Sequence, residues 1–215
     1  MQRDPRDTLH GVTDFADSAT GTAAAETDAA ADAQVLLRPL RLETDTAAVS
    51  SLIVDYLTWA LDRLMQEYGI DESPTDLDSI SESLKAYTQP TATMIVAEQR
   101  GSLIGLGALR TLTPGTVEVK RMYVAPLGRG RRLGSRLLDR LLLEARQNFQ
   151  AETVRLDTCR FMADAQRLYG SRGFVERSPY AGTEIPEHLQ KYWRFYELDL
   201  AGTVSADGAT VGVAE

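Results

Sequence analysis

The sequence predicts one domain of the mixed α/β class, in which a mostly antiparallel sheet is flanked by helices. Three observations predict it. Residues 92–124 contain three strand-like runs separated by short turns that contain glycine, as in an antiparallel meander. The third run is followed by a helix and a further strand at 153–157, and a strand–helix–strand unit pairs its strands in parallel. An alternating stretch at 192–200 provides a closing strand.

The chain before the meander is predicted to form one strand and one long helix. Residues 35–40 indicate an edge-type strand that ends at its proline, which cannot donate a ladder hydrogen bond. Thr44 or Asp45 can cap a helix that extends to about Tyr68, where Gly69 stops it. Apolar residues fall on one side of this helix: Val49, Leu52, Ile53, Tyr56, Leu57, Ala60, Leu61, Leu64 and Met65.

Two glycines lie inside the second strand of the meander. Residues 92–98 and 103–111 are predicted to pair through a hairpin turn at 99–102. Gly105 and Gly107 fall in the middle of the second strand, where a missing side chain usually marks the close approach of another part of the chain. They are not a dinucleotide-binding fingerprint, because no helix begins there.

The third strand of the meander and the helix after it organise the chain. Val117 and Val119 alternate with polar residues, but the next apolar residues are Met122 and Val124. The alternation therefore slips by one residue near Lys120, which predicts a β-bulge that bends the strand and redirects the side chains after it. One apolar stripe then marks the helix: Leu133, Leu137, Leu138, Leu141, Leu142 and Ala145.

This helix opens in a loop rich in glycine and arginine, from Arg129 to Gly134. The first turn of a helix has unpaired backbone N–H groups and a partial positive charge, and glycine lets an anion approach the backbone closely. Arginines at this end oppose the helix dipole unless an anion is also present. A solvated basic helix start is the alternative, but the pattern favours a phosphate site.

The pattern Arg129-x-x-Arg132-x-Gly134 after a strand, followed by Leu-Tyr-x-x-x-Gly-Phe at 168–174, resembles the GCN5-related N-acetyltransferases. The resemblance covers roughly residues 35–200 and implies that family's fold, a sheet splayed between its fourth and fifth strands. It implies acetyl-CoA as co-substrate, with its pyrophosphate on the loop amides, and no metal. The family's loop is Gln/Arg-x-x-Gly-x-Gly/Ala, so Arg132 replaces a glycine; this restricts the backbone and adds a side chain that could contact phosphate.

The resemblance also implies which residues hold the cofactor. Backbone donors at Met122 to Val124 would hold the pantetheine arm and polarise the thioester carbonyl. Met162 stands where the family often has an asparagine that contacts CoA, which is a departure from the family's pattern. The expected cofactor-binding residues are Met122, Tyr123, Val124, Arg129, Gly130, Arg131, Arg132, Leu133, Gly134, Ser135 and Ala165.

Two residues are candidates for the proton transfers. Tyr169 occupies the position of the family's tyrosine acid, whose hydroxyl faces the CoA sulfur, and a phenol of pKa ~10 is protonated at neutral pH. The alternative for Tyr169 is a core aromatic residue beside Phe174. Glu118 is the best placed carboxylate to accept the amine proton, directly or through water. Its alternative is a strand residue paired with Lys120 or Arg121.

The expected function is therefore an acyl-CoA-dependent N-acyltransferase that moves acetyl from acetyl-CoA to a primary amine of a small molecule or peptide by direct attack. In the resembled family, the acid-rich stretch 71–83 helps to form the acceptor wall, and a short helix from about Asp76 to Tyr87 is plausible here. An acidic wall would suit a cationic amine, and a solvated acidic face is the alternative. Lys120 or Arg121 could instead contact an acidic acceptor.

Two other classes of function stay open. A catalytically degenerate acyl-CoA-binding regulator would keep the loop but lack a working acid and base. A nucleic-acid binder could use the basic residues at 120–140, but the stretch has no aromatic stacking platform and the rest of the chain is acidic.

The composition sets limits on the rest. Residues 1–34 and 201–215 lack a periodic apolar pattern and hold most of the net charge of −8, which predicts a disordered acidic N-terminal tail and a flexible C-terminal tail around a domain at 35–200. No secretory signal is recognisable, and Cys159 is the single cysteine, so a cytoplasmic protein without membrane or nucleic-acid partners is expected. Aromatic residues of the closing strand could line a homodimer seam, although one face of such a strand is usually core: Tyr192, Trp193, Phe195 and Tyr196.

Overall fold

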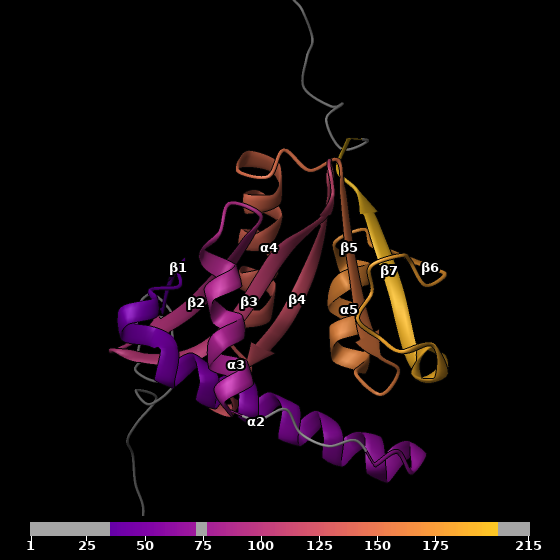
Figure 1. Ribbon diagram of the computed structural model, residues 1–215, viewed down its shortest axis with the longest axis horizontal. Helices are drawn as coiled ribbons and strands as arrows, with labels where there is room; N and C mark the ends of the chain where they lie inside the picture. The colour runs from indigo at the N-terminus through magenta and orange to yellow at the C-terminus, as the bar shows by residue number, and fades with distance from the viewer. Residues whose placement is uncertain (1–34, 72–76, 202–215) are drawn as a thin grey trace, which may run out of the picture. The chain divides into compact units, whose positions relative to one another are not determined.

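The computed structural model describes residues 35–71 and 77–201 (Figure 1). The predicted acidic tail at 1–34 and nearly all of the predicted C-terminal tail lie outside the described residues. Most of the acid-rich stretch before the second helix also lies outside them.

One seven-stranded sheet organises the described chain, in the order β1-β2-β3-β4-β5-β7-β6. The strands are β1 (Val35–Pro39), β2 (Ala92–Gln99), β3 (Ser102–Thr113), β4 (Thr116–Val124), β5 (Thr153–Cys159), β6 (Val175–Arg177) and β7 (Trp193–Asp199). All neighbours are antiparallel except β4 and β5, which are parallel. The predicted mixed sheet, its meander and its edge strand β1 are confirmed.

Helices pack against both faces of this sheet. The helices are α2 (Leu42–Tyr68), α3 (Leu77–Leu84), α4 (Leu133–Gln147) and α5 (Ala163–Ser171), with 3-10 turns η1 (Lys85–Thr88), η2 (Pro126–Gly128) and η3 (Glu187–Tyr192). The predicted apolar stripe of α4 is buried in one core cluster, which also holds Tyr169 and Phe174. The apolar side of α2 packs with Ile80 and Leu84 in a second cluster.

The start of α2 differs from the prediction. The helix begins at Leu42 with Arg41 in the N-cap position, so neither Thr44 nor Asp45 is the cap. The Asp45 carboxylate lies in the first turn and accepts hydrogen bonds from the Arg41 backbone N–H (2.8 Å) and from Arg38 (2.6 and 3.0 Å). A buried arginine on β1 thus draws the carboxylate away from a simple cap. Gly69 ends α2 with φ 66°, as predicted.

The predicted bulge in β4 is confirmed. Leu106 pairs with Tyr123 and Ala108 pairs with Lys120, so β4 holds one residue more than β3 over this span. Arg121 carries the irregularity with φ 55°. A Cβ on Gly107 would lie 2.9 Å from the sulfur of Met122, so a missing side chain on β3 leaves room for the bulged strand.

The bulge coincides with the point where the sheet splits. β4 and β5 pair only from Thr116 with Thr153 to Val119 with Leu156. Beyond this rung the two strands diverge (Figure 1), as the expected splay requires.

Candidate active site

Two adjoining cavities lie at the divergence of β4 and β5. The first, here called the loop cavity, has a volume of about 550 Å³ and is bordered by the segment from Gly128 to Ser135. The second, here called the cleft cavity, has a volume of about 480 Å³ and is bordered by β4, β5, α2, α3 and the chain before β7. Both cavities share five wall residues: Tyr56, Met122, Met162, Ala165 and Tyr169. The two cavities therefore adjoin at Tyr169.

The loop cavity gathers most of the residues predicted to bind the cofactor. Its wall includes the end of β4, the loop, the start of α4 and part of α5: Met122, Tyr123, Val124, Arg129, Gly130, Arg132, Leu133, Gly134, Ser135 and Ala165. Of the predicted set, only Arg131 is missing from this wall. Met162, which stands in place of the family's asparagine, also lines it.

The start of α4 has backbone amides that are unpaired within the helix. The first hydrogen bond inside the helix joins the Arg136 N–H to the Arg132 carbonyl (3.0 Å), so the amides that precede it have no acceptor in the helix. Gly130 and Arg132 both have positive φ, 78° and 55°. Arg132 thus adopts the left-handed conformation that glycine favours, although its side chain makes this conformation costly.

Tyr169 lies where the two cavities meet. Its side chain is buried at 5% exposure, and its ring packs against Phe174 and Tyr196 with centroids 5.9 and 6.1 Å apart. Burial, followed by the nearby charge of Asp157, raises the pKa of Tyr169 above its ordinary value. The two interpretations of this residue are therefore compatible: it is part of the core, and it also lines both cavities.

Glu118, the predicted base, lies outside both cavities. Its side chain is fully buried and is missing from the walls of both cavities. Its carboxylate accepts hydrogen bonds from Arg110 Nε (2.5 Å) and the Tyr180 hydroxyl (2.6 Å), while Lys120 Nζ is 3.9 Å away. The geometry supports a structural role for Glu118, because both carboxylate oxygens already hold protein partners.

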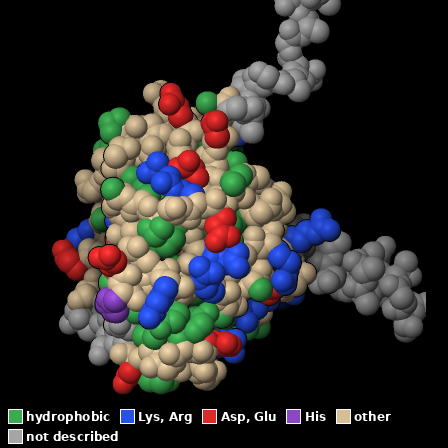
Figure 2. All heavy atoms as spheres, turned by 90° about the vertical axis from the view of Figure 1, so that its right-hand side faces the viewer, with side chains coloured by type: hydrophobic (Ala, Val, Ile, Leu, Met, Phe, Trp, Pro, Cys, Tyr) green, Lys and Arg blue, Asp and Glu red, His purple; other side chains and the backbone are tan. Residues whose placement is uncertain are grey.

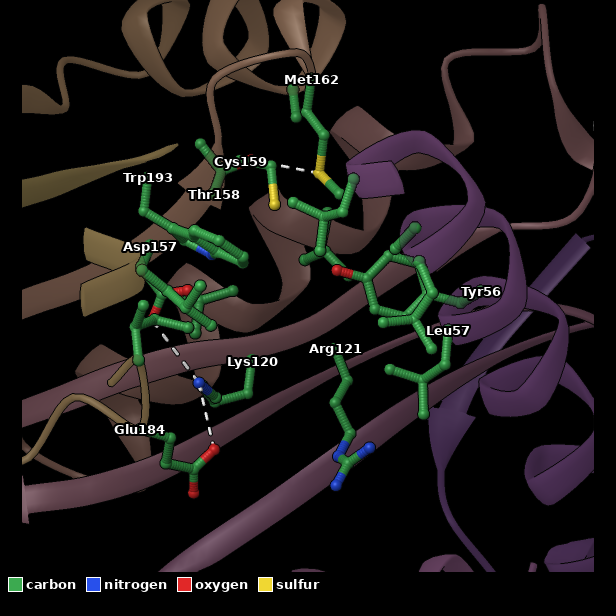
Figure 3. A pocket seen from close by; sticks show the side chains of 18 of the residues that line it. Tyr56, Leu57, Lys120, Arg121, Asp157, Thr158, Cys159, Met162, Glu184 and Trp193 are labelled. Atoms are coloured by element: carbon green, nitrogen blue, oxygen red, sulfur yellow. Dashed lines mark hydrogen bonds and ion pairs between the residues drawn. The ribbon is translucent and has the colours of Figure 1, made fainter. Parts of the chain in front are cut away.

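A different carboxylate lies in the cleft cavity. Lys120 Nζ lies 3.5 Å from Asp157 Oδ2 and 3.2 Å from Glu184 Oε2 (Figure 3). The Asp157 side chain is only 9% exposed, and its Oδ2 accepts no hydrogen bond from the described residues. Burial raises the pKa of Asp157, and the charge of Lys120 opposes this shift.

The pKa values of Lys120 and Glu184 move in the direction opposite to the effect of burial, because neighbouring charges outweigh it. Burial lowers the pKa of Lys120, but the charges of Asp157, Glu118 and Glu184 more than offset this and raise it. Burial raises the pKa of Glu184, but Lys120 and Arg110 lower it overall. The lysine is therefore charged, and it partly neutralises the carboxylates around it.

Sequence reasoning missed Asp157, Glu184, Arg110 and Tyr180. A signal was available for Asp157, which ends the predicted fifth strand, beside the slip at Lys120. Glu184 and Tyr180 come from the irregular chain between β6 and η3, where no periodic pattern indicates which side chains turn inward.

The aromatic residues of the closing strand, which could have lined a homodimer seam, are largely occupied within the chain. Phe195 and Tyr196 are buried and Trp193 lines the cleft cavity, so these aromatic groups serve the core and the site. Basic and acidic side chains are interspersed on the face that Figure 2 shows, and β6 and β7 there carry ion pairs such as Arg194 with Glu176 (2.8 Å).

The described residues contain neither a metal-binding cluster nor a membrane-spanning helix. Across 35–71 and 77–201, no three His, Cys, Asp or Glu side chains are grouped so as to hold a metal ion. In the same segments, no helix is both long enough and apolar enough to cross a bilayer, including the 27-residue α2.

Comparison with known proteins points to one family. The model of the Acetyltransferase (GNAT) family matches residues 57–174. The chain is 30% identical over 155 residues to an uncharacterized N-acetyltransferase of Schizosaccharomyces pombe, with 71% of this chain and 90% of that protein covered. It is 32% identical over 148 residues to the IAA acetyltransferase of Azospirillum brasilense, with 68% of this chain and 94% of that protein covered.

Solved structures share the fold. The structure of yncA from Salmonella typhimurium with its cofactor acetyl-CoA superposes with a TM-score of 0.59 at 22% identity, over 81% of this chain and 99% of that one.

Proposed function

Because the chain belongs to the GNAT family of acetyltransferases, we propose that it transfers an acetyl group from acetyl-CoA to a primary amine, with Tyr169 as the proton donor to the departing thiol. The observation that carries the proposal is the position of Tyr169 on the shared wall of both cavities. A thioester that enters from the loop cavity and an amine that enters from the cleft cavity would meet beside its hydroxyl.

In this proposal the loop cavity holds acetyl-CoA. The unpaired amides at the start of α4 would bind the pyrophosphate, with help from the guanidinium groups of Arg129 and Arg132. The end of β4 diverges from β5, so its backbone can pair with the pantetheine arm instead of a strand. Arg131 is missing from the wall of the loop cavity, so we propose that it acts on the phosphates only as a more distant positive charge.

The chemistry needs two proton movements. The amine nitrogen attacks the thioester carbonyl, the new N–C bond forms, and the C–S bond then breaks with its electron pair on sulfur. Tyr169 gives the thiolate its proton, and burial keeps that hydroxyl protonated beforehand. We assign the proton of the attacking nitrogen to Asp157 rather than to Glu118, because Asp157 lines the cleft cavity and its Oδ2 is without a hydrogen bond.

The alternative is an acyl-CoA-binding regulator with no chemistry. Such a protein would need neither a buried phenol at the junction of two cavities nor a buried carboxylate that faces the second cavity. Both features are present, so the geometry favours the enzyme.

The test is release of free thiol from acetyl-CoA across a panel of primary amines, with binding of acetyl-CoA measured in parallel by calorimetry. The proposal expects binding in the absence of amine, and thiol release that depends on an amine. Binding with no release from any amine would favour the regulator. Absence of binding would contradict the proposal.

A further inference from the structure

Arg121 lies in the cleft cavity without an ion pair among the described residues, and we propose that it binds a carboxylate of the acceptor. The acceptor is then an amine that also carries a carboxylate and an apolar body, as an amino acid with an apolar side chain does. This inference rests on the proposed function and names the acceptor class of the same site.

Among the described residues, one hydrogen bond engages the Arg121 guanidinium. Its hydrogen-bond partner within the described chain is the Tyr87 hydroxyl, 3.2 Å from Nε. A guanidinium has five N–H donors in a planar fork that matches a carboxylate. The other charged side chains on the cavity wall are already joined: Lys120 lies within ion-pair distance of both Asp157 and Glu184. Arg121 is the exception among the described charged residues of this wall.

The backbone directs Arg121 into this position. Its φ of 55° is unfavourable for a residue with a side chain, and it arises at the bulge of β4. The bulge places two successive cationic side chains, Lys120 and Arg121, on the wall of one cavity. Figure 3 shows the Arg121 side chain extending apart from the group formed by Lys120, Asp157 and Glu184.

The cavity therefore has two separate polar ends. Asp157 Oδ2 accepts no hydrogen bond within the described chain, although Lys120 Nζ lies 3.5 Å away, and such an oxygen suits an amine. Arg121 offers N–H donors, which suit an anion. The described charged residues on the wall are two cations and two anions, so a dipolar acceptor leaves the charges balanced. A purely cationic acceptor would leave the Arg121 charge without a counterpart.

The rest of the wall is mostly apolar. Leucines of α2, together with side chains from α3, η3 and β7, face the cavity: Leu57, Leu61, Leu64, Ile80, Leu189 and Trp193. The described side chains that α3 contributes are Ser79, Ile80 and Ser83. Asp71 and Glu82, the acids of the stretch 71–83 whose side chains are described, do not line this cavity. An acceptor that carries an apolar group fits this lining better than a polyamine does.

The first test measures carboxylate binding without catalysis. The CoA-loaded protein is titrated with 4-methylpentanoate and 3-phenylpropanoate, and with the amide of each. We expect the wild type to bind the carboxylates more tightly than the amides, and Arg121→Gln to weaken only carboxylate binding, by about 10- to 100-fold. Arg41→Gln is the matched control, because Arg41 is exposed and missing from both cavity walls, and should bind like the wild type. Equal binding of carboxylate and amide, no carboxylate binding, or an unchanged Arg121→Gln variant would overturn the inference.

The second test uses turnover. L-leucine, L-phenylalanine and 6-aminohexanoate are compared with 3-methylbutylamine, 2-phenylethylamine and pentylamine, which lack the carboxylate. Arg121→Gln should raise KM for the favoured amino acid by about 10- to 100-fold, with kcat and the KM for acetyl-CoA little changed. Turnover of the decarboxylated amines at equal or higher kcat/KM would overturn the inference and leave the proposed function intact. A protein that binds no acetyl-CoA would contradict the proposed function, while the same carboxylate titration of the protein without CoA would still test Arg121.

Discussion

Lys120 Nζ lies 3.5 Å from Asp157 Oδ2, at the first pair of residues beyond the last paired rung of β4 and β5. The divergence of the strands removes backbone partners at this point and exposes both side chains to one cavity. The distance is within ion-pair range, yet Asp157 Oδ2 accepts no hydrogen bond from the described chain. This is the carboxylate oxygen that we propose accepts the proton of the attacking amine.

The Asp157→Asn substitution should lower kcat by about 10²-fold or more, because it removes the group proposed to accept the amine proton. Burial raises the pKa of Asp157, so wild-type activity should fall as the pH decreases through a value above the ordinary ~3.9 of an aspartate. The variant should lack this acidic limb. The measurement is the pH profile of thiol release with the best amine of the panel.

Glu184→Gln is the control for that experiment. Glu184 also contacts Lys120, but its side chain is 58% exposed and it forms a second ion pair with Arg110. Its removal should change kcat only a few-fold. An Asp157→Asn variant with wild-type kcat and an unchanged pH profile would rule out Asp157 as the base.

Two substitutions of Arg132, to glycine and to alanine, distinguish the effect of backbone strain from the effect of phosphate binding. Its φ of 55° is costly for any residue with a side chain, so Arg132→Gly should be about 1 kcal/mol more stable to unfolding than Arg132→Ala. Both variants lose the guanidinium, so both should bind acetyl-CoA more weakly than wild type, by a similar factor. Urea denaturation and calorimetry measure the two effects. Equal stability of the two variants would contradict the strain argument.

Asp45 ties β1 to α2 and should make stability depend on pH. Hydrogen bonds from Arg38 lower the pKa of this buried carboxyl. A carboxyl whose folded pKa is lowered stabilises the fold above its unfolded pKa of ~3.9, and this contribution is lost as the pH falls through the folded value. Asp45→Asn should therefore lower the free energy of unfolding by about 2–3 kcal/mol at pH 7.

The difference between Asp45→Asn and wild type should shrink as the pH is lowered below ~4. Glu82→Gln is a suitable control, because the pair of Glu82 with Lys85 is exposed and should contribute less than about 0.5 kcal/mol. A difference that stays constant down to low pH would show that the Asp45 charge is not the cause.

Local patterns predicted the parts of this fold that depend on neighbouring residues. The one-residue slip near Lys120 predicted the bulge, since a period of two cannot shift without an extra residue. The stripe from Leu133 to Ala145 predicted the buried face of α4, and the strand–helix–strand order predicted the parallel pairing of β4 and β5. The unpaired amides at the start of α4 could also be predicted, because every helix begins with backbone N–H groups that have no partner within the helix.

The choice between Glu118 and Asp157 could not be predicted in this way. Alternation along β4 shows that Glu118 and Lys120 share a face, but not what covers that face. The Tyr180 hydroxyl that donates a hydrogen bond to Glu118 lies 62 residues away in sequence, and Arg110, the second donor, lies on the neighbouring strand. Which carboxylate stays free is decided by these distant partners, so it required the structure.

The most direct measurement of the central claim is kcat for thiol release by wild type and by Tyr169→Phe, at saturating acetyl-CoA and with the same amine. The substitution removes one hydroxyl and keeps the ring that packs against Phe174 and Tyr196. The proposed proton transfer predicts a loss of about 10²-fold in kcat with an unchanged dissociation constant for acetyl-CoA. A Tyr169→Phe enzyme with wild-type kcat would contradict the proton-donor role.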